Sequence, residues 1–287
     1  MDIIYRYDPF EPLQLTSPDS AADALAELKQ GNLRFAEMVR RMQARTEGAP
    51  AGEPLVFSIN PVSLGLPIVH GYAPPQTPFA LVVNCSDARV STESVFDQSF
   101  NNLFVVRVAG NVLGTELLGS VHYAVKNLTS LRVALVLGHT ECGAVTAAVD
   151  GYLAPEAYGD IAFSYPLRSL VDRLQVAVRT AAKSLEQIYG VGIRVQPNFR
   201  AAVRDLAVYL NAAITAYDLA RELPSTCDPP LAVVFAVYDI STVAVQAHPD
   251  GPGDGERCFA TAPTSSSAFV ELVDRWARSK AIAAMLE

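Results

Sequence analysis

Four short apolar runs constrain the fold of this 287-residue chain more than any other feature of its sequence. They are Phe79–Asn84 (FALVVN), Leu103–Val108 (LFVVRV), Arg132–Leu137 (RVALVL) and Leu231–Tyr238 (LAVVFAVY). Each has the length of a strand, and helical patterns lie between them. Strands that alternate with helices form a parallel sheet, and strands that are apolar throughout are covered on both faces. The sequence therefore predicts an α/β fold whose central, mainly parallel sheet has about four strands, with an edge strand at residues 242–246.

Helical patterns precede the first strand and fill the longer intervals between the strands. An apolar stripe predicts an amphipathic N-terminal helix that begins at Ser17-Pro18, with serine as N-cap, and ends near residue 44. The stripe consists of Leu25, Leu28, Phe35, Met38 and Met42. The other predicted helices cover residues 115–127, 144–150, much of 165–187 and 198–222, and 267–285. We therefore expect helices to flank the sheet, together with an N-terminal helical arm.

Composition divides the chain into three parts. Residues 1–78 form an N-terminal arm, helix and loop, because prolines crowd residues 1–16 and prolines and glycines crowd residues 46–78. Residues 79–248 form the α/β core. Residues 249–287 form a Gly/Pro/Ser-rich linker (249–266) and a C-terminal helix.

The composition also excludes some partners. A formal net charge of -8 argues against a nucleic-acid partner, because little in such a chain would neutralise a phosphate backbone. The N-terminus has acidic residues where a signal peptide has basic ones, and no apolar run is long enough to cross a bilayer. We therefore expect a soluble, cytoplasmic protein with no membrane or nucleic-acid partner.

Two of the predicted strands lead directly into side chains that bind metals. The first runs into Cys85-Ser86-Asp87-Ala88-Arg89, and the third runs into Gly138-His139-Thr140-Glu141-Cys142-Gly143. Sites in open α/β sheets form beyond the carboxyl ends of the strands, so Cys85 would meet His139 and Cys142 if these strands are adjacent. Two thiolates and one imidazole suit zinc, and three protein ligands leave a fourth position for water. Cys142 would also lie at a helix N-terminus, which favours its thiolate.

A more ordinary interpretation exists for each motif alone. A cysteine that ends a strand is more often a small core residue, and one His-x-x-Cys is a weak signal. Two such motifs at the ends of separate strands favour a metal site. The remaining candidates lack such support and are expected to be structural or exposed residues: His70, His122, His248, Cys227, Cys258 and the glycines of Gly251-x-Gly253-x-Gly255.

Three segments in order, CSDARV, FDQSFNNLFVVRVAGN and GHTECGAV, resemble the bacterial β-class carbonic anhydrases. The resemblance extends from LKQGNLRF (Leu28–Phe35) to VVFAVYDI (Val233–Ile240). It implies that Cys85, His139 and Cys142 bind Zn²⁺ and that Asp87 and Arg89 form the catalytic Asp–Arg dyad of the family. The chain departs from the family pattern at Ser91, at Asn101-Asn102, and in the longer segment 151–197. None of these departures falls on a metal-binding or dyad position.

The resemblance also implies a reaction, the reversible hydration of carbon dioxide to bicarbonate and a proton by zinc-bound hydroxide. Asp87 would orient the hydroxide, and Arg89 would hold Asp87 in place. In some family members the aspartate instead binds zinc and displaces the water. Alternatives are hydrolysis of carbonyl sulfide or carbon disulfide at the same site, or a non-catalytic bicarbonate-binding or scaffold protein.

The resemblance further implies a homodimer or a multiple of dimers, with the N-terminal helix in the core or at the dimer interface. The C-terminal helix lies beyond the resemblance, and its apolar stripe must be buried somewhere. We expect it to dock through Trp276, the sole tryptophan, on its own subunit or a neighbour. The competing hypothesis is a lid over the site.

Overall fold

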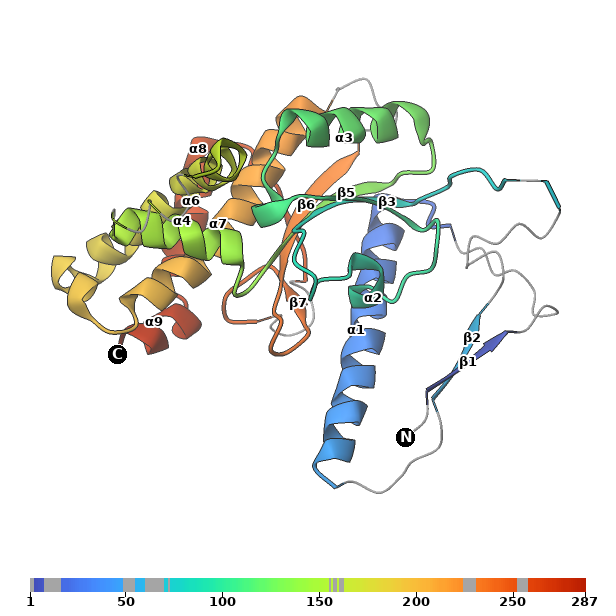
Figure 1. Cartoon of the computed structure of the whole chain (residues 1–287), viewed down its shortest axis with the longest axis horizontal. Helices are drawn as coiled ribbons and strands as arrows, with labels where there is room; N and C mark the ends of the chain where they lie inside the picture. Colours follow the sequence, from blue (N-terminus) through green and yellow to red (C-terminus); the bar gives the residue numbers. More distant parts are fainter. Residues whose placement is uncertain are drawn as a thin grey trace.

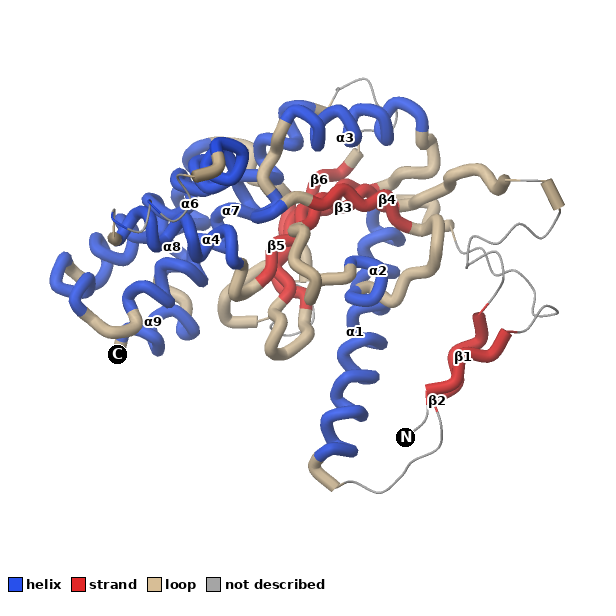
Figure 2. Tube along the Cα trace, viewed as in Figure 1, coloured by secondary structure: helices blue, strands red, loops and turns tan. Residues whose placement is uncertain are grey.

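A six-stranded sheet lies in the middle of the protein (Figures 1 and 2). The computed structural model describes residues 3–7, 17–48, 55–59, 70–71, 73–154, 156, 159, 163–223, 231–251 and 258–287. The strands follow the order β4-β3-β5-β6-β7, and β8 also pairs with β6. Their bounds are β3 (Ala80–Asn84), β4 (Leu103–Arg107), β5 (Val133–His139), β6 (Ala232–Tyr238), β7 (Val245–Gln246) and β8 (Ala260–Thr261). The strands β4, β3, β5 and β6 are parallel, whereas β7 and β8 are antiparallel to β6. The predicted mainly parallel sheet with an edge strand is confirmed.

Alternate residues of the strands point to two separate hydrophobic cores. Leu81, Val83 and Val136 belong to the core beneath the larger group of helices, whereas Val82 and Leu135 belong to the core on the opposite face. The helices of the first face are α3 (Thr115–Asn127), α4 (Gly143–Leu153), α6 (Tyr165–Tyr189), α7 (Phe199–Glu222), α8 (Ser266–Ala277) and α9 (Lys280–Leu286). The opposite face packs against α1 (Ala21–Thr46) and α2 (Thr92–Val95), as Figure 1 shows. Burial of both faces explains why the strands are apolar throughout.

Helix α1 begins three residues later than predicted. Its N-cap is Ser20, whose hydroxyl oxygen accepts a hydrogen bond from the backbone N–H of Asp23 at 3.2 Å. The prediction of Ser17 as N-cap is therefore wrong, because a second serine supplies the better-placed cap. The helix ends at Thr46, close to the predicted end.

One buried polar side chain fixes α1 against the sheet. Asn32 donates hydrogen bonds to the carbonyl oxygens of Val95 (3.1 Å) and Val243 (3.0 Å). Its side-chain oxygen accepts a hydrogen bond from the backbone N–H of Val245 at 2.9 Å. Its neighbour Gly31 allows α1 to lie directly against the backbone at the end of α2.

The expected N-terminal arm and surface loop contain two strands that the sequence analysis did not predict. β1 (Ile3–Tyr7) and β2 (Leu55–Ile59) pair in parallel, in a small sheet separate from the six-stranded one (Figure 1). Each strand needs a partner about fifty positions away along the chain, and the surrounding prolines dominate the local pattern. The prediction of irregular structure over these two runs is therefore wrong.

The C-terminal segment docks on its own chain. The ring of Trp276, which is 1% exposed, lies 5.7 Å from the ring of Tyr209 and 5.8 Å from that of Phe235, measured between centroids. This confirms docking through Trp276. The single predicted helix is instead two, α8 and α9, because α8 ends at its C-cap Arg278 and Ser279 caps the start of α9. The predicted linker, residues 249–266, contains β8, so the prediction of a linker is wrong for this strand. Residues 252–257 of the linker lie outside the described residues.

The described residues also include two 3-10 turns, η2 (Ala109–Asn111) and η4 (Val191–Val195). Within the described residues, no helix combines the length and the apolar composition needed to cross a bilayer.

Candidate metal centre

The sheet topology brings the two predicted metal-binding motifs together. β3 and β5 are adjacent and parallel, so the segment after Asn84 and the end of β5 lie at the same edge of the sheet. The chain passes from β3 to β4 on one side and then crosses to β5 on the other side. The connections therefore diverge beside β3, which is where open α/β sheets form their sites.

Cys85, His139 and Cys142 converge at this place. Their ligand atoms all lie within 4.8 Å of one another, and the two sulfur atoms are 3.9 Å apart. Cys85 is 4% exposed, His139 1% and Cys142 2%. Tetrahedral zinc with Zn–S bonds of about 2.3 Å holds two sulfur atoms about 3.8 Å apart, so the observed separation suits a shared zinc ion.

The imidazole of His139 is oriented by the backbone. Its Nδ1 lies 2.9 Å from the carbonyl oxygen of Thr140, which can only accept, so Nδ1 carries a hydrogen and donates a hydrogen bond there. Its Nε2 is buried and has no hydrogen-bond partner among the described residues. A buried nitrogen without a partner is costly in an ordinary core. This arrangement, with a backbone carbonyl holding the opposite nitrogen, is typical of a histidine that binds a metal.

The two thiols form a pair that shares negative charge. The hydrogen bond from Cys142, with help from His139 and the backbone N–H of Gly110, lowers the pKa of Cys85 to about 4. The Gly110 nitrogen lies 3.3 Å from the Cys85 sulfur. Donation to Cys85 and burial raise the pKa of Cys142 in the absence of a metal. Cys142 is the N-cap of α4, as predicted, so backbone N–H groups of that helix face its sulfur.

Asp87 and Arg89 form an ion pair beside the three ligands. The Arg89 side chain donates to both carboxylate oxygens of Asp87, at 3.0 and 2.8 Å, and its backbone N–H donates to one of them at 2.9 Å. These bonds hold the pKa of Asp87 well below its usual range. One carboxylate oxygen is 3.9 Å from Nε2 of His139, but the carboxylate is outside the group of mutually close ligand atoms. Arg89 also donates to the carbonyl oxygen of Glu141 at 3.2 Å, which ties the two motifs together.

Several residues that hold this site were not singled out from the sequence. The carbonyl of Thr140 orients His139, the N–H of Gly110 contacts Cys85, and the side chain of Asn211 donates to the carbonyl oxygen of Gly110 at 2.8 Å. Gly110 has a positive φ of 69°, and a Cβ there would lie 3.1 Å from the Leu174 side chain. The sequence signal was the glycine in the segment FDQSFNNLFVVRVAGN, which carries part of the family resemblance.

The other histidines and cysteines lie outside this group. His70 and His122 are exposed, and His248 is half-buried. Cys258 is half-buried and is not part of the cluster, whereas Cys227 lies outside the described residues.

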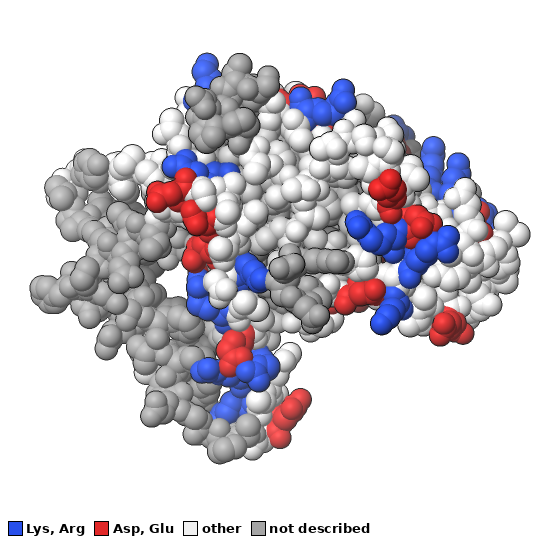
Figure 3. Space-filling model, turned by 180° about the vertical axis from the view of Figure 1, so that it is seen from behind, with Lys and Arg blue, Asp and Glu red and all other residues white. Residues whose placement is uncertain are grey.

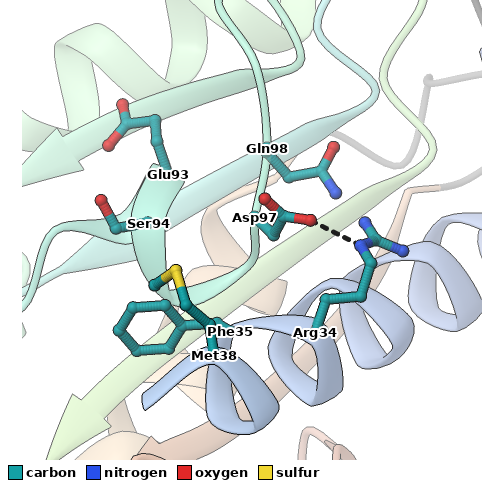
Figure 4. A pocket seen from close by; sticks show the side chains of 7 residues that line it. All are labelled: Arg34, Phe35, Met38, Glu93, Ser94, Asp97 and Gln98. Atoms are coloured by element: carbon teal, nitrogen blue, oxygen red, sulfur yellow. Dashed lines mark hydrogen bonds and ion pairs between the residues drawn. The ribbon is translucent and has the colours of Figure 1, made fainter. Parts of the chain in front are cut away.

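A separate pocket of about 260 Å³ lies between α1 and the segment 93–98, which follows the candidate metal-binding loop (Figure 4). Figure 4 shows Arg34 pointing across it to Asp97, and the two side chains are 2.5 Å apart. None of the three ligand residues lines this pocket. On the face of the molecule in Figure 3, acidic and basic side chains lie beside one another rather than gathering by sign.

Comparison with known proteins agrees with the site chemistry. The model of the family described as carbonic anhydrase matches residues 80–245, more than half of the chain. Carbonic anhydrase 2 of Mycobacterium tuberculosis is 42% identical over 108 residues, which cover 38% of this chain and 49% of that protein. A carbonic anhydrase of Mycolicibacterium smegmatis is 36% identical over 159 residues, which cover 55% of this chain and 64% of that protein. The matched region thus spans between about half and two thirds of these curated relatives.

Solved structures show a weaker likeness. A tetrameric β-carbonic anhydrase of Sordaria macrospora has a TM-score of 0.47 and 20% identity, covering 60% of this chain and 81% of that one.

Proposed function

This chain belongs to the β-class carbonic anhydrase family, and we propose that it catalyses the reversible hydration of carbon dioxide to bicarbonate at a zinc ion held by Cys85, His139 and Cys142. The observation that best supports the proposal is the environment of the Nε2 atom of His139. Its Nε2 is buried, has no hydrogen-bond partner among the described residues, and belongs to a group with two buried thiols whose ligand atoms lie within 4.8 Å of one another. An imidazole and two thiolates form a donor set that zinc prefers, and three such ligands leave one position open.

The bound zinc ion would act as a Lewis acid that makes hydroxide available near neutral pH, as it does in carbonic anhydrases with three histidine ligands. Cys85 and Cys142, both as thiolates, would balance the charge of the ion. The N–H of Gly110 and the N-terminus of α4 stabilise these thiolates, because each directs donors at a sulfur atom.

Asp87 is the residue proposed to orient the attacking oxygen. Its carboxylate is ionised, because Arg89 donates to both of its oxygens. It lies near the site without belonging to the ligand group, so it can accept a hydrogen bond from water and direct a lone pair toward carbon dioxide. The proposed role of Arg89 is to hold this carboxylate in place.

A stopped-flow assay of carbon dioxide hydration, with a parallel assay of carbonyl sulfide hydrolysis, tests the proposal. The protein loaded with zinc is expected to hydrate carbon dioxide and to turn over carbonyl sulfide far more slowly. Hydrolysis of carbonyl sulfide without carbon dioxide hydration would assign the alternative substrate. Zinc-loaded protein that is inactive in both assays would contradict an enzymatic role.

We also propose that the chain assembles as a dimer or a multiple of dimers. Helix α1 exposes Leu33 (51%) and Met42 (45%) in the described structure, and contact with a second copy would bury such side chains. Light scattering at micromolar concentration is the test, and a monomer there would contradict the assembly.

A further inference from the structure

The segment from Cys85 to Arg89 has to place two different groups at once. It carries the sulfur of Cys85 and, two residues later, the carboxylate of Asp87. The segment is neither a helix nor a strand, so no regular hydrogen-bond ladder fixes its backbone. Its position must therefore depend on contacts from neighbouring elements.

Asn84 provides these contacts from the buried side of the segment. Its side-chain oxygen accepts a hydrogen bond from the backbone N–H of Cys85 at 2.7 Å. Its side-chain nitrogen donates to the hydroxyl of Thr92 at 2.7 Å, at the start of α2. Asn84 thus anchors the first residue of the segment to the element that follows it.

Arg107 provides the contacts from the other side. It is the last residue of β4 and is paired with Asn84 in the parallel register of the sheet. Its Nε donates to the carbonyl oxygen of Cys85 at 3.0 Å, and one terminal nitrogen donates to the carbonyl oxygen of Asp87 at 2.6 Å. A guanidinium group is planar and holds its donors in a fixed fork, so these two bonds set where both carbonyls lie relative to each other.

We propose that Arg107 is a positioning residue of the metal centre, which fixes the Cys85 sulfur and the Asp87 carboxylate relative to each other. Arg107 differs from Arg89, because it binds the backbone of the segment rather than the carboxylate. Its effect on turnover rests on the proposed function, whereas its effect on metal retention does not. Residues that hold metal ligands in this indirect way commonly change metal affinity or activity by about 10- to 100-fold when replaced.

Two substitutions and a control test this role. Arg107→Met removes both hydrogen-bond donors and keeps an apolar side chain. Arg107→Lys keeps the positive charge, but its single ammonium group lacks the planar fork that lets arginine donate to both carbonyl oxygens. The control is Arg132→Met, because Arg132 also donates to two carbonyl oxygens, those of Thr129 (2.9 Å) and Leu131 (3.1 Å). Arg132 directly precedes β5, at the end of the sheet opposite the metal centre.

The measurements are the rate of zinc transfer from the zinc-loaded protein to a chromogenic chelator, kcat and KM for carbon dioxide, and the unfolding midpoint. Arg107→Met is expected to release zinc about 10-fold faster and to lower kcat by about 10- to 100-fold, with a smaller change in KM. Arg107→Lys should lie between Arg107→Met and the unmodified protein. Arg132→Met should keep both rates, even if its unfolding midpoint falls.

Zinc transfer from Arg107→Met at the unmodified rate would overturn the proposal, as would equal acceleration in Arg132→Met. If Arg107→Met does not accumulate as folded protein, Arg107→Lys decides by the same criteria. If the unmodified protein itself hydrates no carbon dioxide, the proposed function fails, and zinc transfer still decides the role of Arg107.

Discussion

Replacement of glycine by alanine is expected to have opposite effects at two helical positions, Gly31 and Gly119. In α1, a Cβ at position 31 would lie 1.7 Å from the carbonyl oxygen of Phe96 and 2.7 Å from its carbonyl carbon. In α3, no atom outside the local backbone lies within 4 Å of a Cβ at position 119. The same added methyl group therefore meets backbone in one helix and open space in the other.

The magnitudes follow from these distances. In an exposed helix interior, alanine is favoured over glycine by about 0.5–1 kcal/mol, so Gly119→Ala should raise the free energy of unfolding by that amount. Gly31→Ala gains the same helix-propensity contribution, but α1 must move away from α2 to relieve the overlap between the added Cβ and the backbone of Phe96. Overpacking costs about 1–3 kcal/mol, and loss of the three hydrogen bonds of Asn32 costs about 1 kcal/mol each. The net expectation is a loss of about 3–5 kcal/mol.

Chemical denaturation, followed by far-ultraviolet circular dichroism at fixed zinc concentration, measures both variants. Fixed zinc matters, because a ligand bound only to the folded state raises its apparent stability. A Gly31→Ala protein as stable as the unmodified chain would refute the close approach of α1 to the end of α2. A Gly119→Ala protein destabilised by more than about 1 kcal/mol would refute the open environment in α3.

Two further substitutions test the C-terminal helix and the dyad. Trp276→Ala should lower the free energy of unfolding by about 3–5 kcal/mol, because it leaves a cavity at a fully buried site. Val270→Ala is the control on the same helix. Because Val270 is 65% exposed, this substitution should change the free energy of unfolding by less than about 0.5 kcal/mol. Circular dichroism is the appropriate probe, since Trp276 is the sole tryptophan, and equal effects would argue against docking. Asp87→Ala should keep its zinc and lose most of its carbon dioxide hydration in a stopped-flow assay. Unchanged turnover would remove Asp87 from the mechanism.

The sheet could be predicted from the sequence because it is buried on both faces. Continuous apolar runs such as Val133–Leu137 arise only where helices cover both sides of a strand, so the pattern is local and strong. The adjacency of β3 and β5 was an assumption, and it placed Cys85 beside His139 correctly. The three proposed ligand residues could be singled out because each stands at the end of a strand or just beyond it.

The elements that the sequence did not reveal depend on distant partners or on competing caps. β1 and β2 pair across about fifty positions of proline-rich sequence, and β8 pairs with β6, a strand more than twenty positions earlier in the chain. Ser20 and Ser279 each supplied a cap that the apolar periodicity did not indicate. Runs of apolar residues fix the existence of a helix more firmly than its ends.

The contacts around the proposed metal ligands could not be predicted from the sequence either. The donation from Arg107 to two carbonyl oxygens depends on the register of β3 and β4. The contact of His139 Nδ1 with the carbonyl oxygen of Thr140 depends on the conformation of the chain at the end of β5. Arg107 could have been suspected, because it ends the strand beside the one that leads into Cys85. Its two acceptors are backbone atoms, which every residue has, so no sequence motif marks them.

Zinc content before and after removal of one proposed ligand tests the central claim most directly. Elemental analysis of the purified protein should find about one zinc per chain. Cys258→Ser, which alters a cysteine outside the cluster, should keep this zinc and the carbon dioxide hydration that it supports. Cys142→Ser is predicted to lose both. Full zinc occupancy in Cys142→Ser would contradict the assignment of Cys85, His139 and Cys142 as the metal centre.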